Sequence, residues 1–146
     1  MEVAVDSNIL VFLADPRSLF HDDSAAATSR LSKGGDSLVV FPQNLIEFWA
    51  VATRPVLSNG LGFTAAQVVA EIAQIRSIFR LIPETSQIYP EWQRLVTAHN
   101  VAGKNVHDTR IAAQMLVHGI ESILTFNTKD FKRFANITAL DPSDIR

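Results

Sequence analysis

Residues 2–10 read EVAVDSNIL, and this stretch decides how the start of the chain is expected to fold. The apolar run 3–5 is typical of a short strand that is buried on both faces of a sheet. The polar turn 6–8 follows directly, and from Ile9 onward apolar residues recur at helical spacing. A strand, a polar turn and a helix in this order indicate an α/β protein.

The remaining sequence repeats this alternation of strands and helices. Further apolar strands are predicted at residues 38–41, 81–82, 122–125 and 137–140. Apolar residues at helical spacing predict the main helices at 24–31, 42–54, 64–79, 89–99 and 108–119. No internal repeat of about 20 to 50 residues is present, which argues against solenoids and propellers. We therefore predict one domain over residues 1–146, with three α/β/α layers and a mainly parallel central sheet.

The composition predicts a folded protein of the cytoplasm, with no membrane segment. Of the 146 residues, 47% are hydrophobic and 19% are charged, which is enough apolar surface for a core. Apolar runs are interrupted well before the roughly 18 residues that a membrane span needs. The chain has no cysteine, which excludes disulfides, thiolate catalysis and cysteine-based zinc sites. A metal would have to bind through oxygen or imidazole.

The net charge alone does not indicate a nucleic-acid binder. It is −2 at pH 7, whereas phosphate contacts usually come from Lys and Arg. If a metal neutralised four acidic residues, the other 11 would face 13 Lys and Arg. The composition therefore permits polyanion binding without demonstrating it.

Four acidic residues fall where ligands bind in parallel α/β sheets. Each lies just after a predicted strand or near the start of a helix: Asp6, Glu47, Asp108 and Asp130. Ligands of such sheets bind outside the carboxyl ends of the strands. Carboxylates gathered there would repel one another unless hard cations such as Mg²⁺ or Mn²⁺ neutralised them. This arrangement favours metal-assisted phosphodiester hydrolysis.

Each of these residues also has an explanation that needs no metal. Asp6, Asp108 and Asn127 are of the types that cap helices, and Asp130 fits the acid that often follows a cap three residues later. Glu47 lies on a largely apolar helix, where it could be solvated or ion-paired. The individual motifs are therefore weak, and only their combination is informative.

Other chemistries lack their sequence signals. The motifs GxxxxGK[ST], GxGxxG and GxSxG are absent, which argues against nucleotide-triphosphate, dinucleotide and serine-hydrolase sites. The four histidines show no i, i+4 metal pair. Most aromatic residues lie at core spacing, and only Phe126 is left open as a platform for base stacking.

Four segments together resemble the PIN-domain family, in the order expected for that family. They are residues 5–10 (VDSNIL), the helix with Glu47, residues 107–113 (HDTRIAA) and residues 124–131 (LTFNTKDF). The loop from 53 to 62 is also similar to one that is frequent in bacterial members. The resemblance spans nearly the whole chain, and it implies a PIN-like fold.

The resemblance implies a Mg²⁺- or Mn²⁺-dependent endoribonuclease that cleaves single-stranded RNA. Such proteins are often VapC-type toxins, which a cognate antitoxin holds inactive and which are commonly homodimers. By motif match, Asp6, Glu47 and Asp108 take the core acid positions. Some relatives carry an acid where this chain has Asn127, so Asp130 is expected to serve as the fourth acid or to act through water.

Polar and basic neighbours of these acids have expected roles as well. The groups expected to orient the carboxylates are Ser7, Asn8, Thr125 and Asn127. The cations that flank the motifs and could hold RNA phosphates are Lys104, Arg110, Lys129, Lys132 and Arg133. An ordinary solvated surface explains these cations almost equally well.

Two other classes of function compete with the ribonuclease hypothesis. A PIN scaffold that keeps its acids could act as a non-catalytic RNA- or protein-binding module. A Mg²⁺-binding phosphotransfer domain of the response-regulator or haloacid-dehalogenase type would need paired acids or a D-x-D motif after the first strand. The chain has Asp6-Ser7-Asn8 at that place and lacks both.

Overall fold

A computed structural model describes residues 1–145 of the protein, in which five strands form one parallel sheet. The strands are β1 (Glu2–Val5), β2 (Ser37–Val40), β3 (Arg80–Leu81), β4 (Ser122–Leu124) and β5 (Thr138–Leu140). Their order across the sheet is β3-β2-β1-β4-β5, and every neighbouring pair runs parallel. The register places Ala4 of β1 beside Val39 on one side and Ile123 on the other. The predicted α/β class and parallel sheet are confirmed.

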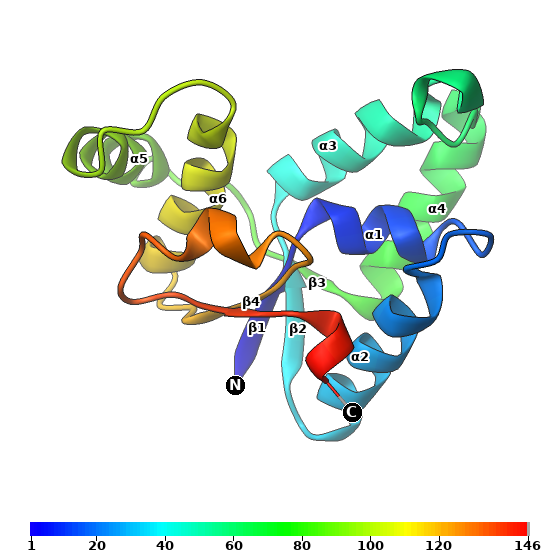
Figure 1. Cartoon of the computed structure of the whole chain (residues 1–146), viewed down its shortest axis with the longest axis horizontal. Coiled ribbons are helices and arrows are strands. Elements are labelled where there is room, and N and C mark those ends of the chain that lie inside the picture. Colours follow the sequence, from blue (N-terminus) through cyan, green and yellow to red (C-terminus); the bar gives the residue numbers. More distant parts are fainter. Residues whose placement is uncertain (146) are drawn as a thin grey trace.

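Six α-helices in residues 1–145 pack around this sheet. They are α1 (Ser7–Leu13), α2 (His21–Lys33), α3 (Pro42–Thr53), α4 (Ala65–Ile78), α5 (Ile88–Ala98) and α6 (Asn105–Val117). Short 3-10 helices occupy three of the connections: η1 (Val56–Ser58), η2 (Thr128–Phe131) and η3 (Pro142–Asp144). Figure 1 shows α5 and α6 on one side of the strands and α1 to α4 on the other, which gives the predicted three layers.

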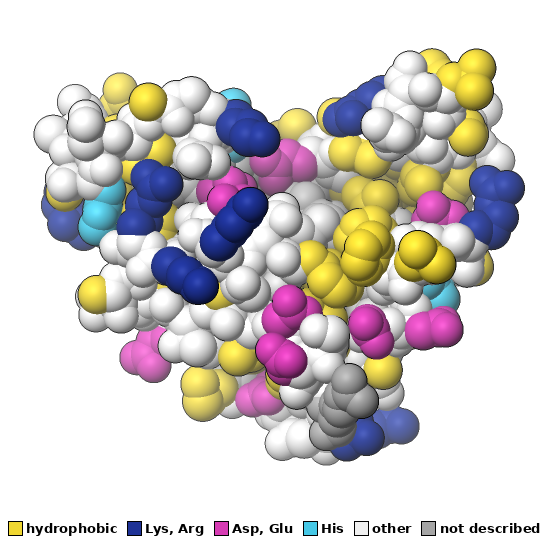
Figure 2. All heavy atoms as spheres, viewed as in Figure 1, with side chains coloured by type: hydrophobic (Ala, Val, Ile, Leu, Met, Phe, Trp, Pro, Cys, Tyr) yellow, Lys and Arg dark blue, Asp and Glu magenta, His cyan; other side chains and the backbone are white. Residues whose placement is uncertain are grey.

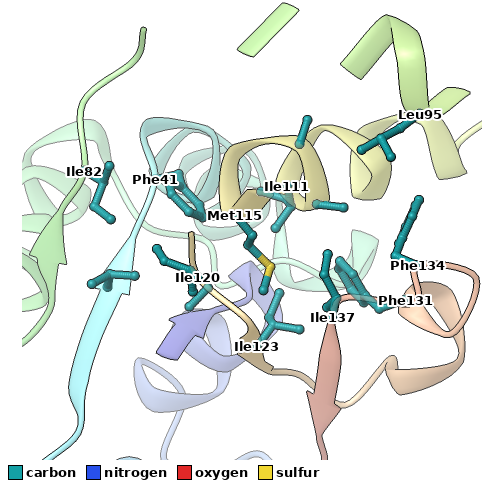
Figure 3. Packing of buried hydrophobic residues seen from close by; sticks show 14 residues of the cluster. Phe41, Ile82, Leu95, Ile111, Met115, Ile120, Ile123, Phe131, Phe134 and Ile137 are labelled. Atoms are coloured by element: carbon teal, nitrogen blue, oxygen red, sulfur yellow. The ribbon is translucent and has the colours of Figure 1, made fainter. Parts of the chain in front are cut away.

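Side chains of the strands alternate between two buried clusters, one on each face of the sheet. Val3 and Val5 of β1 pack in the cluster that contains residues of α1 to α4. Ala4 belongs instead to the cluster of α5, α6 and η2. In this cluster Met115 points down between Ile111 and Ile123, and Phe131 and Phe134 lie beside them (Figure 3). Because both faces are covered here, β1 and β2 each end in a continuous run of three buried apolar residues.

The order of the strands reverses between β1 and β4. From β1 the chain moves through β2 to β3 on one side, and it then returns to place β4 on the other side of β1. In sheets of this kind, such a reversal opens a crevice at the carboxyl ends of the two strands, where ligands bind. Asp6 directly follows β1 and Thr125 directly follows β4, so the fold places both residues at this crevice.

Two helices begin three residues earlier than predicted. The helix predicted from residue 24 begins at His21, and its acidic first turn favours a helix N-terminus. The helix predicted from Asp108 begins at Asn105, so Asp108 lies inside the first turn and does not open the helix. None of the helices in residues 1–145 has both the length and the apolar character needed to cross a membrane.

Candidate functional site

The four predicted acids come together at the carboxyl ends of the strands. Asp6 follows β1, while Glu47 lies on α3, Asp108 on α6 and Asp130 in η2. Burial is the main cause of the raised pKa of Asp6 and of Asp108, and in both cases the charges of the other acids raise it further. Figure 2 shows a hollow between the two groups of helices, with acidic side chains at its base and Lys or Arg on both rims.

Asp6 is the most buried of the four acids, with 6% of its surface exposed. Two hydrogen bonds hold its carboxylate: the backbone N–H of Ser7 donates to Oδ1 at 2.8 Å, and the hydroxyl of Thr125 donates to Oδ2 at 2.7 Å. Burial raises the pKa of Asp6 to about 6, although both hydrogen bonds oppose the increase. A nearby cation would favour the charged carboxylate.

Thr125 connects Asp6 to two of the residues that were expected to orient the acids. Its hydroxyl oxygen accepts a hydrogen bond from Asn8 Nδ2 at 3.4 Å and one from the backbone N–H of Asn127 at 3.0 Å. Among the described residues, Asn8 and Asn127 are therefore linked to the Asp6 carboxylate by hydrogen bonds through Thr125. The buried hydroxyl fixes the direction in which the Asp6 carboxylate points.

Glu47 is held by a second group of hydrogen bonds that begins at Ser7. The Ser7 hydroxyl donates to Glu47 Oε1 at 2.6 Å and accepts from Asn44 Nδ2 at 3.2 Å. Gln43 Nε2 lies 3.4 Å from Glu47 Oε2 as a further donor. Since the backbone of Ser7 also binds Asp6, this one residue positions two of the four carboxylates.

Gln43 is a buried residue of the site that the sequence analysis missed. Its Nε2 donates to the carbonyl of His107 at 2.9 Å, and its Oε1 accepts from Arg110 at 3.1 Å and from Gln114 at 3.0 Å. These contacts join α3 to α6, the two helices that carry acids. The available signal was its place on an apolar helix, four residues before Glu47 and therefore on the same face.

Asp108 and Asp130 are less restrained than the other two acids. In the part of the chain that the structure describes, no hydrogen bond reaches either carboxylate. Burial raises the pKa of Asp108 to about 7, the charges of the three other acids add to this, and Lys104 opposes it. Asp108 does not cap α6, and Asn127 makes no side-chain cap bond to η2, so capping explains neither residue.

The donor set has the chemistry that a hard divalent cation requires. Carboxylate oxygens are the ligands that Mg²⁺ and Mn²⁺ prefer. Among residues 1–145, no three His, Asp or Glu side chains already surround a common point as ligands would. Like charges repel, so a cation would have to draw Asp108 and Asp130 toward the restrained pair, and no hydrogen bond opposes that movement.

Three of the five cations that could hold RNA phosphates lie in different surroundings. Lys104 is exposed at the start of α6, close enough to Asp108 to lower its pKa, and Lys129 is exposed in η2. Arg110 already contacts Glu84 at 2.7 Å in addition to Gln43. Lys104 and Lys129 are therefore accessible to a phosphate, whereas Arg110 would have to exchange one of its partners.

Comparison with known proteins extends these observations. The family model described as PIN domain matches residues 3–137. Ribonuclease VapC48 of Mycobacterium tuberculosis is 28% identical over 146 residues, which cover 97% of this chain and 98% of that protein. The structure of VapBC2 from Rickettsia felis bound to a DNA fragment from their promoter is similar with a TM-score of 0.74 and 18% identity, over 97% of this chain and 98% of the other. A toxin–antitoxin complex from Klebsiella pneumoniae is similar with a TM-score of 0.66 and 18% identity, over 96% and 97%.

Proposed function

This chain belongs to the PIN domain family, and we propose that it is a metal-dependent ribonuclease for single-stranded RNA and the toxin of a toxin–antitoxin pair. The observation that carries the proposal is the convergence of four carboxylates, from four separate elements, at the point where the strand order reverses. The match to a protein named ribonuclease VapC48 along nearly the whole chain supports it.

The four carboxylates would hold Mg²⁺ or Mn²⁺ as the cofactor. When bound, such a cation supplies a water nucleophile at neutral pH and stabilises negative charge on the phosphodiester. Asp6 and Glu47 would provide ligands of fixed direction, because Ser7 orients both of them. Lys104 and Lys129 would hold phosphates of the RNA backbone.

The partner that we propose is a cognate antitoxin protein. The Rickettsia felis VapBC2 structure and the Klebsiella pneumoniae toxin–antitoxin complex share the fold of this chain. Exposed apolar side chains on α3 and α4, among them Ile46, Trp49 and Val69, offer a surface on which a protein partner or a second copy could pack.

A non-catalytic binding scaffold explains the site less well. Such a protein would have no need to keep two partly buried carboxylates whose pKa burial raises. A charge that is costly to bury is retained most readily where a ligand of opposite charge compensates it.

The direct test is cleavage of a mixed single-stranded RNA pool with Mn²⁺, with Mg²⁺ and with EDTA. We expect metal-dependent cleavage by the unchanged protein and a loss of at least about 100-fold in Asp6→Asn and Asp108→Asn, since each removes a proposed metal ligand. Glu121→Gln is the matched control, because Glu121 is exposed and precedes β4, at the opposite end of the sheet from the acids.

Binding of the metal has its own measurement. Mn²⁺ should raise the melting temperature of the unchanged protein and of Glu121→Gln, and it should raise that of Asp6→Asn much less. The proposed metal mechanism would be contradicted if the protein cleaved RNA in EDTA. It would also be contradicted if Asp6→Asn and Asp108→Asn kept full activity. Metal binding without cleavage of any RNA in the pool would favour the scaffold.

A further inference from the structure

A pocket with an aromatic wall lies beside the acid cluster. Phe12 of α1, Phe20 at the start of α2 and Phe126 after β4 bring three rings together, with centroids 4.9 to 5.4 Å apart. The pocket that they line has a volume of about 540 Å³, within the roughly 300–1,000 Å³ of small-ligand sites. Figure 2 shows hydrophobic side chains exposed on this face, over α1 and the segment that joins it to α2.

Phe20 presents its ring to solvent from a fixed backbone. It is 46% exposed, although two other rings lie against it. Its N–H donates to the Ser18 hydroxyl at 3.1 Å, and its carbonyl accepts from the Ser24 hydroxyl at 2.7 Å. An exposed aromatic ring on a well-held backbone is the kind of surface on which an unpaired base stacks.

The pocket and the acid cluster share Thr125 as a neighbour. Asn8 and Asn127 line the pocket, and both donate hydrogen bonds to the Thr125 hydroxyl, which in turn holds Asp6. The buried side-chain oxygen of Asn8 has no hydrogen-bond partner among the residues that the structure describes. A ligand in the pocket would therefore lie next to the proposed cleavage site.

The charged residues of the pocket select against phosphate. Asp23 and Asp141 line it and carry negative charge, whereas no Lys or Arg does so among the lining residues. One carboxylate oxygen of Asp141, Oδ1, accepts from the N–H and the hydroxyl of Ser143 at 2.9 and 2.8 Å. Carboxylates repel a phosphate but accept hydrogen bonds from amino groups on the edge of a base.

We propose that this pocket binds one unstacked base of the RNA strand beside the phosphodiester to be cleaved, and that it favours a base with an exocyclic amino group. This inference rests on the proposed function, because it takes the bound strand to be the RNA that the protein cleaves. The base stacks on Phe20 and Phe126, and its amino group donates to Asp23. Recognition of single-stranded RNA usually works through splayed bases of this kind.

The test uses two fluorescent 12-nucleotide oligomers, one of cytidylate and one of uridylate. Both bases have a single ring, but only cytosine carries an exocyclic amino group. Binding is followed by fluorescence anisotropy with Mg²⁺ in the Asp108→Asn background, where no cleavage is expected. We expect tighter binding of the cytidylate oligomer. Phe20→Leu should weaken its binding about tenfold, and Asp23→Asn should bring the two affinities together.

Tyr89→Leu is the matched control for the aromatic change, because Tyr89 is 63% exposed on α5, on the other side of the sheet. It should leave both affinities unchanged. The proposal that this pocket binds a base would be overturned if Phe20→Leu bound the cytidylate oligomer as tightly as its parent. It would also be overturned if Tyr89→Leu lost as much affinity as Phe20→Leu. Equal binding of both oligomers by the parent would overturn the preference for an amino group.

Failure of the pocket and failure of the proposed function give different results. The binding assay needs no cleavage, so it decides on the pocket by itself. If the unchanged protein showed no metal-dependent cleavage, that result would instead contradict the proposed ribonuclease function. Phe20 is half exposed, so Phe20→Leu should change the melting temperature little. An unchanged melting temperature would show that a loss of RNA binding does not come from unfolding.

Discussion

The two halves of the acid cluster are held in different ways. Asp6 and Glu47, the fixed half, each receive two hydrogen bonds from neighbouring groups. Asp108 and Asp130, the adjustable half, receive none within residues 1–145. The fixed half follows the first two strands of the chain, whereas the adjustable half comes from its last third.

This difference shows how four like charges can share one site. Carboxylates of fixed direction give a cation a defined place to bind, but they cannot turn away from one another. Carboxylates without such bonds can move apart when the site holds no cation and approach when one binds. The fixed half should therefore define the place where the cation binds, and the adjustable half should carry the movement.

Removing the charge of Asp6 should stabilise the fold. Burial raises its pKa to about 6 in the folded protein, against about 3.9 in an unfolded chain. The protonated Asp6 carboxyl therefore favours the folded state. This contribution to the free energy of unfolding is complete below about pH 4 and is lost as the pH rises through about 6. We expect Asp6→Asn to raise the free energy of unfolding at pH 8 in EDTA by up to about 3 kcal/mol, as measured by urea denaturation.

The matched variant from the adjustable half is Asp108→Asn. Burial raises the pKa of Asp108 to about 7, but water screens its partly exposed carboxylate, so the gain in stability should be smaller than for Asp6→Asn. At pH 3.5 neither variant should differ much from the unchanged protein. Equal gains from both variants at pH 8 would contradict the division of the cluster into two halves.

Loosening the fixed half should reduce its affinity for metal. Thr125→Val keeps the shape of a buried side chain but removes the hydroxyl that donates to Asp6 at 2.7 Å. Loss of a group that orients a metal ligand usually reduces metal affinity or activity by about 10- to 100-fold. A titration with Mn²⁺, followed by melting temperature and by RNA cleavage, measures both effects.

Thr28→Val serves as the control for this change. Thr28 is also buried, but its hydroxyl donates to the carbonyl of Ser24 within α2, away from the acids. The two variants should lose similar stability, and only Thr125→Val should bind Mn²⁺ more weakly. An unchanged Mn²⁺ affinity in Thr125→Val would mean that the direction of Asp6 is fixed without the threonine.

Sequence could predict the local parts of the site but not its long-range contacts. The strands and the places of Asp6 and Thr125 follow from local patterns, because an apolar run and the polar turn after it lie within a few residues. Gln43 meets Arg110 and Gln114 from 67 and 71 residues away, and that contact depends on how α3 and α6 are rotated in the fold. The ring cluster around Phe20 was missed for the same reason, since its members belong to three separate segments.

The start of α6 shows a second limit of local patterns. Asp108 and Thr109 are residues that commonly cap a helix, so the pattern placed the N-terminus there. The helix instead begins at Asn105, where Lys104 provides no side-chain cap. The burial of Thr109 and the contact of Gln43 with the His107 carbonyl anchor this end of the helix, and tertiary contacts therefore replace the cap.

The ion pair between Arg110 and Glu84 should matter least. Its side chains are 35% and 44% exposed, so water screens their attraction, and exposed pairs usually contribute less than about 1 kcal/mol. We expect Glu84→Gln to lower the free energy of unfolding by no more than that, similar to Glu91→Gln, which removes the exposed pair with Arg94 on α5. A loss above about 2 kcal/mol, well beyond the range of surface pairs, would show that Glu84 holds Arg110 against the buried Gln43. In that case the ion pair would belong to the support of the cluster, and the adjustable half would be less mobile than its missing hydrogen bonds indicate.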